Sequence, residues 1–506
     1  MNTKRTLIWL LALCLLVTSF FACGNKNTTS TSVTEVTTDA PVDTEPVEIE
    51  DEGIDFWVQN QAGFASAVEG ADEDFETKVE NGTVTILSYK GTQEHLIIPS
   101  TINGLPVTAI ADGAFAVQKK EENKQEADQE NSEESQETNE EENKDPEEPQ
   151  LFLKTLILPD SILTIGNGVL EGCKTLHSLQ TPLMGADKES KQYLGYLFGA
   201  TNHEDNPLKI PATLSCLRIS GAWETLPAYA LFDCNDLICV SFPETLTTIE
   251  KYAMFDCMSL KQIDGLDKIT VFGERALMNC SDLQILTLSN SLETVGFGTF
   301  EGCTSIRALT LPFVGGTRTQ NTYLGYLFGA AQPDFAKGFY PSKLAKINLT
   351  DACQTLGNYA FFECESLKEI TLPEGLTSIG VRAFYGCTKL WSIKLPDTLT
   401  TVRELAFANC DALLTIDFGQ GLTSIGINAF YNCDSLTEIK LPTSLKALPA
   451  SCFAGCISLT KIDFGGVREV GAEAFRHCNA VATVIATENI AFGDGNDTVK
   501  SVLYPD

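Results

Sequence analysis

Apolar and polar residues alternate along most of this chain in a pattern with a 23-residue period. One copy reads LPEGLTSIGVRAFYGCTKLWSIKLP, and another reads GQGLTSIGINAFYNCDSLTEIKLP. Their shared pattern is P-x-x-L-x-x-I-G-x-x-A-F-x-x-C-x-x-L-x-x-I-x-L. Self-similarity at a fixed period of about 20–50 residues is the signature of a repeat protein, so each copy is expected to form one unit of a stack.

Each repeat predicts a short strand, a return leg and a tight turn. In one repeat the segment 367–372 alternates apolar and polar residues, as a strand with one buried face does. Pro373 is expected to end this strand because it has no N–H to donate to the ladder. Gly380 is expected to permit a bend. The segment 383–387 is expected to form a helical or 3₁₀ turn that closes the coil.

One 23-residue coil cannot bury its apolar side alone, whereas stacked coils bury each other's. The predicted fold is therefore a solenoid whose coils each combine a short parallel β-strand with a tight helical or 3₁₀ turn. Phe115, at the Phe position of the pattern, and eleven cysteines at its Cys position together count twelve anchored coils. The eleven ladder cysteines are Cys173, Cys234, Cys257, Cys280, Cys303, Cys364, Cys387, Cys410, Cys433, Cys456 and Cys478.

The 17 cysteines of the chain raise the question of disulfide bonds. We interpret the ladder cysteines as free thiols, because their spacing follows the coil and free cysteine behaves as a small buried apolar residue. Cys452 replaces the alanine of the repeat and is predicted to be buried. Cys216, Cys239 and Cys353 lie outside the ladder, and the pattern does not assign them.

Two intervals of the ladder are longer than the period. Cys173 to Cys234 and Cys303 to Cys364 are both steps of 61, which is 23 plus 38. Both contain the octet YLGYLFGA, at Tyr193–Ala200 and at Tyr323–Ala330, so the octets are offset by 130. Because 61 plus three times 23 equals 130, a block of four coils has been duplicated. The sequence thus predicts two 38-residue inserts, at about 180–212 and 310–342.

The octets have two interpretations. They pack against the solenoid, or they project as paired aromatic loops roughly 20–25 Å apart, four to five strand spacings, and bind a repetitive partner. The second interpretation makes their aromatic residues candidate ligand-binding residues: Tyr193, Tyr196, Phe198, Tyr323, Tyr326 and Phe328.

The predicted strand face carries its own candidates. One outward position holds Thr371, Lys394, Asp417, Lys440 and Asp463 in successive repeats, and its alternating charges indicate pairing between neighbouring strands. At another position Trp391 is a candidate for an exposed binding aromatic, although a single aromatic residue on a strand also commonly packs against its neighbours.

The repeats resemble the BspA-like leucine-rich repeats of bacterial surface proteins, known by the pattern LTSIG..AF..C..L..I.LP, over about 82–478. The resemblance implies a leucine-rich-repeat solenoid that binds host proteins, matrix or other cells as an adhesin. A glycan-binding or nutrient-capture protein is the main alternative. An enzyme and a structural spacer remain further interpretations, because function depends on sites and not on the fold.

The N-terminus predicts export. Lys4 and Arg5 precede a short apolar run, and the segment 19–23 (SFFAC) resembles a lipobox, in which Cys23 is diacylated and becomes the new N-terminus. Residues 1–22 are then the lipoprotein signal peptide, and the Thr-rich, acidic segment 23–53 is interpreted as a solvated tether. The expected location is the bacterial cell envelope, with the membrane reached only through the lipid.

The remaining boundaries follow from composition. Residues 54–118 are expected to form an N-terminal cap and first repeat, 151–478 the repeat array, and 479–506 a C-terminal cap. The run 119–150 holds 14 acidic residues and 4 lysines, and we interpret it as a disordered insertion. With a net charge of −33 the chain is not expected to bind nucleic acid, which requires clustered Lys and Arg.

Catalytic and metal-binding patterns are weak. The four histidines have no metal-ligand spacing, and no nucleophile elbow, zinc-protease or phosphate-loop motif occurs. His203-Glu204-Asp205 is the one local cluster of interest, but the second copy reads Gln332-Pro333-Asp334 nearby and has no such cluster. No cofactor, no metal and no enzymatic activity are therefore predicted.

Overall fold

The computed structural model describes residues 62–117, 152–190, 192–479, 481, 483–486, 489–499 and 503. Contacts divide the chain into two units, 1–44 and 45–506, and the first lies outside the described residues. The predicted signal peptide, lipid-attached Cys23, tether and acidic insertion also lie outside them.

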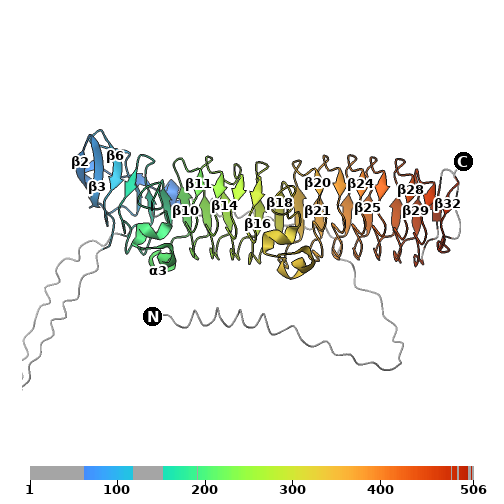
Figure 1. Ribbon diagram of the computed structural model, residues 1–506. Helices are drawn as coiled ribbons and strands as arrows, with labels where there is room; N and C mark the ends of the chain where they lie inside the picture. The colour runs from blue at the N-terminus through green and yellow to red at the C-terminus, as the bar shows by residue number, and fades with distance from the viewer. Residues whose placement is uncertain are drawn as a thin grey trace, which may run out of the picture. The chain divides into compact units, whose positions relative to one another are not determined.

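The described residues confirm the solenoid (Figure 1). Successive coils contribute one strand each to a first row, in which the paired neighbours run parallel. Sixteen strands form this row in the described part: β1 (Val68–Glu69), β4 (His95–Ile97), β7 (Thr155–Ile157), β9 (Ser178–Thr181), β10 (Cys216–Ile219), β12 (Cys239–Ser241), β14 (Gln262–Asp264), β16 (Ile285–Thr287), β18 (Ala308–Leu311), β19 (Lys346–Leu349), β21 (Glu369–Thr371), β23 (Ser392–Lys394), β25 (Thr415–Asp417), β27 (Glu438–Lys440), β29 (Lys461–Asp463) and β31 (Thr483–Ile485).

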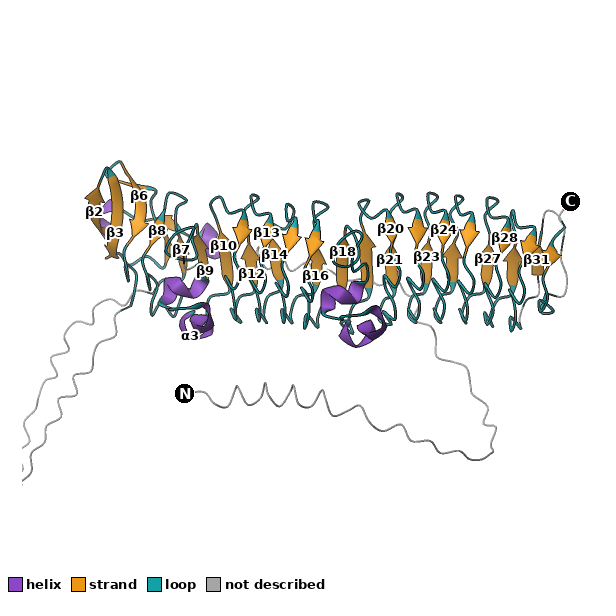
Figure 2. Ribbon diagram, viewed as in Figure 1, coloured by secondary structure: helices purple, strands orange, loops and turns teal. Residues whose placement is uncertain are grey.

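A second row of two-residue strands runs along the return legs (Figure 2). It comprises β8 (Thr164–Ile165), β11 (Thr225–Leu226), β13 (Thr248–Ile249), β15 (Val271–Phe272), β17 (Thr294–Val295), β20 (Thr355–Leu356), β22 (Ser378–Ile379), β24 (Thr401–Val402), β26 (Ser424–Ile425), β28 (Ala447–Leu448), β30 (Glu469–Val470) and β32 (Ala491–Phe492).

The N-terminal end of the array departs from the repeat. After the short helix η1 (Asp72–Asp74), the antiparallel pair β2 (Phe75–Glu80) and β3 (Thr83–Tyr89) continues through β6 (Leu105–Ile110), which pairs with both β5 (Thr101–Ile102) and β8. This sheet lies at the first coils of the stack.

The core lies between the two rows. The central residue of a first-row strand, such as Ile393 or Ile439, and the second residue of a return-leg strand, such as Ile379 or Val402, are buried. Their neighbours along each strand point outward, because successive side chains of a strand alternate between faces.

Each turn brings an apolar pair into the core between two left-handed residues. In one coil these residues are Leu405 and Asn409, with φ of 55° and 59°. Between them, the N–H of Phe407 donates to the carbonyl of Ala429 in the next coil at 2.8 Å. Six turn phenylalanines stack with centroid separations of 4.9–5.8 Å: Phe361, Phe384, Phe407, Phe430, Phe453 and Phe475.

The ladder cysteines are buried free thiols, and Cys452 is buried as predicted. Their sulfur atoms also serve as donors, which the sequence pattern did not indicate. The Sγ of Cys410 donates to the carbonyl of Phe384 at 3.2 Å, and that of Cys433 to the carbonyl of Phe407 at 3.2 Å. Burial raises the pKa of the Cys257 thiol to about 12, which keeps it protonated as a donor.

Two expectations need correction. Each predicted 38-residue insert is itself a coil, because Ser178 pairs in register with Cys216 across it and Ala308 pairs with Lys346 across the second. These two coils and the coils of β1 and β31 lack the anchoring Phe or Cys. The sequence therefore predicted twelve coils, whereas the first row contains sixteen strands in the described residues. At Gly380, an added Cβ would lie 2.5 Å from the backbone of Gly357, so close approach of the coils accounts for this glycine, not a bend.

The chain's own N-terminal segment crosses the outward face of the first row. A Cβ at Gly63 would lie 2.6 Å from the Thr155 Oγ1 and 3.2 Å from the Ser178 Oγ, and both polar residues are buried. The guanidinium of Arg218 lies 4.6 Å from the centroid of the Phe64 ring. The strand face is therefore already covered between β7 and β12.

Candidate functional site

The octets occupy the turn position of the two 38-residue coils. Their central residues form the 3₁₀ helices η2 (Leu194–Phe198) and η4 (Leu324–Phe328). In the first copy the Gly168 N–H donates to the Tyr196 carbonyl at 3.0 Å, and the Leu194 N–H donates to the Ala230 carbonyl at 2.9 Å. The octet is thus hydrogen-bonded to the coil on either side.

The octet side chains are directed into the stack. Phe198, Phe328, Tyr196 and Tyr323 are all buried, while Tyr193 and Tyr326 are partly buried and pack against the core. The hydroxyl of Tyr323 donates to the carbonyl of Ala330 at 3.0 Å, and that of Tyr193 to the carbonyl of Ala200 at 3.3 Å. These contacts favour the packing interpretation for the six aromatic residues.

Trp391 is partly buried and directly precedes β23. Its indole N–H is shielded from solvent, and no acceptor lies within hydrogen-bond distance in the described structure. Packing against its neighbours therefore describes its environment better than presentation to a ligand.

The exposed part of each 38-residue coil follows its octet. The first protrusion, residues 203–209, contains η3 (His203–Asp205) and α3 (Asn206–Lys209), and the second protrusion is η5 (Pro333–Phe339). Figure 2 shows both as short helices at the same edge of the array. They follow β9 and β18, five strand steps apart, which corresponds to about 24 Å.

Buried side chains in or next to each protrusion hold it against the stack. The Asn206 amide accepts from the Gly195 N–H at 3.0 Å and donates to the Phe232 carbonyl at 2.8 Å. In the second copy the buried Ala336 takes the place of Asn206, and the Tyr340 hydroxyl donates to the Phe362 carbonyl at 3.1 Å. The two protrusions are therefore held at equivalent places by different contacts.

The tips of the protrusions have diverged. Asp205 accepts from the Thr201 hydroxyl at 2.8 Å, and Lys209 forms an ion pair with Glu171 at 3.1 Å. At the positions that correspond to Asp205 and Lys209, the second copy has Phe335 and Phe339. These two rings are 63% and 43% exposed.

Sequence reasoning missed these residues, together with Leu208, which is 79% exposed. A signal was present: the octets are identical, whereas the segments directly after them differ. Identity between the copies marks the packed part of the coil, and divergence marks the exposed part.

The His203-Glu204-Asp205 cluster has a structural explanation. The His203 ring stacks on Tyr229 with centroids 4.4 Å apart. The pKa of Asp205 is lowered, first by the hydrogen bond from the Thr201 side chain, so the carboxylate is an ionised turn acceptor. Across the described residues, no group of three or more His, Cys, Asp or Glu could hold a metal ion.

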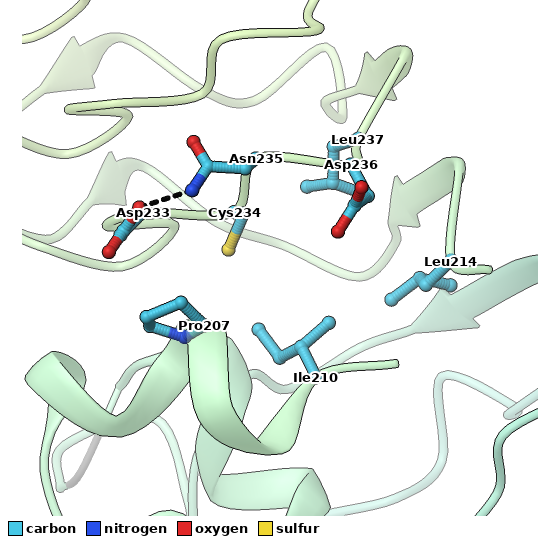
Figure 3. A pocket seen from close by; sticks show the side chains of 8 residues that line it. All are labelled: Pro207, Ile210, Leu214, Asp233, Cys234, Asn235, Asp236 and Leu237. Atoms are coloured by element: carbon cyan, nitrogen blue, oxygen red, sulfur yellow. Dashed lines mark hydrogen bonds between the residues drawn. The ribbon is translucent and has the colours of Figure 1, made fainter. Parts of the chain in front are cut away.

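A small cavity lies between the first protrusion and the next coil (Figure 3). It measures about 60 Å³, and its lining residues are Pro207, Ile210, Leu214, Asp233, Cys234, Asn235, Asp236 and Leu237. Ligand pockets for drug-sized molecules are about 300–1,000 Å³, so this cavity has room only for a few water molecules. Binding to this chain is better sought on its surface.

The strand face of the C-terminal coils is open and carries both charges. Lys394 lies opposite Asp417 across the β23–β25 pair, and Lys440 lies opposite Asp463 across β27–β29. Lys394 forms an ion pair with Glu374 at 4.0 Å, with both side chains mostly exposed. Exposed ion pairs of this kind contribute about 0–1 kcal/mol to the free energy of folding. The face is therefore polar, and its side chains are held only weakly in place.

The repeat geometry agrees with a comparison to known families. The model of the BspA type leucine rich repeat region matches residues 212–322, 336–427 and 382–495, in six copies. The chain belongs to this family. The match begins at residue 212, near the end of the first 38-residue coil, and includes the second-row and Phe–Cys positions of the coils that follow.

Solved structures of similar fold include a leucine rich cell surface protein from Faecalibacterium prausnitzii, 20% identical over 78% of this chain and 93% of that one, with a TM-score of 0.28. A leucine-rich repeat protein from Bacteroides ovatus is 19% identical over 81% and 93%, with a TM-score of 0.31. The pneumococcal vaccine antigen PcpA is 16% identical over 85% and 96%, with a TM-score of 0.29. Among curated proteins no match is found.

Within the described residues, no helix is both long and apolar enough to cross a membrane.

Proposed function

We propose that this BspA type repeat protein is a binding protein of the bacterial cell surface, and that its second protrusion contacts a protein partner. The observation that carries the proposal is the exposure of Phe335 and Phe339 on one short helix. Exposed apolar clusters mark interaction sites, and aromatic anchors supply much of the binding free energy of an interface.

The partner that this surface fits is a host, matrix or bacterial surface protein or glycoprotein with an apolar cleft. Phe335 and Phe339, both exposed on the one 3₁₀ helix η5, are the apolar anchors for such a cleft. The open strand face of the C-terminal coils adds weak polar contacts. The first protrusion, with Leu208, offers a second contact about 24 Å away. Two linked contacts strengthen binding to a repetitive partner without a large single interface.

The location at the envelope is part of the same proposal. The apolar run before Cys23 and the acidic, Thr-rich segment 23–53 support export followed by lipid attachment through a solvated tether. Such a tether places a binding surface away from the membrane.

A glycan-binding or nutrient-capture role is the second candidate. It is favoured by the aromatic rings beside the first protrusion, where Tyr229 stacks on Tyr252 with centroids 5.5 Å apart and His203 stacks on Tyr229. Partly exposed aromatic rings of this kind offer flat apolar faces on which a sugar ring can lie.

The test uses the full chain, immobilised and probed with panels of matrix proteins, mucins and defined glycans. The variant Phe335→Asp/Phe339→Lys carries the tip residues of the first copy, which the same fold already accommodates. We expect this variant to lose at least tenfold in affinity for its protein ligand while keeping its melting temperature. The control Asp205→Phe/Lys209→Phe should keep the binding.

Protein binding that the Phe335→Asp/Phe339→Lys variant retains in full would place the contact elsewhere and refute the assignment to the second protrusion. Binding to defined glycans alone, lost on Tyr252→Ser and unaffected by the tip variant, would support the second candidate instead.

A further inference from the structure

Cys216 and Cys239 form a close pair outside the ladder. They are directly opposite each other in the parallel β10–β12 pair, and their Sγ atoms lie 2.6 Å apart. This separation is well below ordinary non-bonded contact of two sulfur atoms and approaches the length of about 2.05 Å of a disulfide bond. Neighbouring strands are about 4.8 Å apart, within the Cα separation that a disulfide spans.

The pair differs from the ladder cysteines in its surroundings. The ladder thiols point into the core and donate to carbonyl oxygens, as Cys410 does to Phe384. Cys216 and Cys239 lie on the outward side of the first row, whereas the residues that follow them, Leu217 and Val240, belong to the inner core. The nearest polar partner of each sulfur at the first row is therefore the other sulfur.

A cover isolates this pair from solvent. Phe64 of the N-terminal segment completes one small apolar cluster with Cys216 and Cys239, and both cysteines are fully buried. A bond between them would be closed off from reducing agents once this cover is in place.

We propose that Cys216 and Cys239 are joined by a disulfide bond in the exported protein. The bond fastens the coil that follows the first 38-residue coil to its neighbour, beneath the segment that contains Phe64. The proposal rests on the proposed surface location only in that an oxidising compartment supplies the oxidant.

The reaction is a thiol–disulfide exchange with an oxidant that itself carries a disulfide. One cysteine thiolate attacks a sulfur of the oxidant to form a mixed disulfide, and the other thiolate then displaces the oxidant. The two cysteines lose two protons and two electrons, and the oxidant leaves as a dithiol that holds them. The pKa of Cys216 is raised, first by its hydrogen bond with Cys239 and then by burial, so the exchange precedes docking of the cover during folding.

The test is differential alkylation of the full chain recovered from the envelope of cells that express it. Free thiols are blocked with light iodoacetamide in denaturant, the sample is reduced, and the new thiols receive heavy iodoacetamide. We expect heavy label on Cys216 and Cys239 and light label on Cys410 and Cys433, a ladder pair with the same separation along the chain. In the variant Cys216→Ser, Cys239 should change to the light label.

Light label on both Cys216 and Cys239 of the envelope sample would overturn the proposal. A second arm refolds the reduced full chain with oxidised glutathione and maps its cross-linked peptides. A Cys216–Cys239 link is expected there, and failure to form it shows that the pair itself is not suited to bond. A link formed only in this arm shows instead that the chain does not meet an oxidant in the cell, which bears on its location and not on binding by Phe335.

Discussion

The Phe407 ring is held on both faces by the same residue type from adjacent coils. Its centroid lies 4.9 Å from that of Phe384 and 5.2 Å from that of Phe430, with nearly parallel planes. Stacking continues because every coil places its turn phenylalanine at the same point of its circumference. A change in one ring therefore affects the contacts of three coils.

We expect Phe407→Ala to lower the stability of the array by about 3–5 kcal/mol, because it leaves a cavity between two rings that cannot close it. Thermal and urea unfolding followed by circular dichroism measure the effect. The control is Tyr431→Ala: Tyr431 is 39% exposed, and its replacement should change stability by less than about 0.5 kcal/mol. Equal effects of the two variants would contradict the stacked core.

The left-handed position that ends each turn supplies a pH-dependent prediction. Asp256 occupies it with φ of 60°, and the equivalent residue is Asn279 in the next coil. Partial burial raises the pKa of Asp256 above its ordinary value, although the hydrogen bond from the Asn279 amide at 2.7 Å opposes the rise. A carboxyl whose pKa is higher when folded binds protons better when folded, so folding is favoured as pH falls towards that pKa and is disfavoured at neutral pH.

Asp256→Asn is therefore expected to stabilise the chain at pH 7 by roughly 0.5–1 kcal/mol, since it removes the partly buried charge and keeps an acceptor for Asn279. The gain should shrink as pH falls through the raised pKa of Asp256, because the carboxyl then becomes protonated and loses its charge. Melting temperatures across this range measure it. A gain that is independent of pH would assign the effect to the backbone conformation alone.

At this scale the sequence predicted burial well and polar contacts poorly. The 23-residue period identifies which positions face the core, so the burial of the ladder cysteines follows. The stacking of the coils decides which carbonyl oxygen accepts the hydrogen bond of each thiol. It also decides that Cys216 contacts Cys239 beneath Phe64. The repeat pattern holds no information about that cover, because Phe64 precedes the repeats.

Among the elements, the 38-residue coils show where pattern reasoning reaches its limit. Their identical octets were recognised as copies, but an aromatic octet is equally compatible with a loop and with a turn. Only the hydrogen bonds on both sides, such as Leu194 to Ala230, place it within the stack. The exposed tips at Phe335 and Phe339 then follow as the part that the stack leaves outside.

The acidic insertion gives a prediction about the first coil. It lies between Phe115 and Thr155, and without 119–150 the step from one to the other falls from forty positions to eight. The equivalent step in an ordinary coil, from Phe384 to Ser392, is also eight positions. Deletion of 119–150 therefore restores the ordinary spacing, and we expect the melting temperature to change by less than about 2 °C, as for a neutral surface change.

Differential scanning calorimetry of the deletion variant against the full chain provides the measurement. A large fall in melting temperature would show that the insertion contributes contacts to the first coils.

For the whole molecule, attachment is separable from folding. Cys23→Ala is expected to abolish labelling by radioactive palmitate and to release the chain into the soluble fraction, because the acyl chains are its predicted hold on the membrane. Continued labelling of the variant would show that Cys23 is not the attachment site. The melting temperature of the array should be the same in both forms.

The solenoid as a whole was predictable, because one period explains most of the chain. The number of coils was not: the coils of β1, β31 and the two 38-residue segments lack the anchor that was counted. A strand of this row requires only an alternation of apolar and polar residues over three or four positions. Such a pattern is too short to identify a strand unless the neighbouring repeat is recognised as well.

The matching upper and lower surfaces of the coils have a genetic consequence. Because any regular coil can follow any other, unequal recombination can add or remove whole repeats without a new fold, and the duplicated block, which the structure shows to hold five coils from β9 to β16, is an example. Each repeat gained between β9 and β18 would move the two protrusions apart by about 4.8 Å. The number of repeats in this region of the gene thus sets the distance between the two protrusions. Alleles that differ only in repeat number would therefore bind partners whose contact sites are spaced differently.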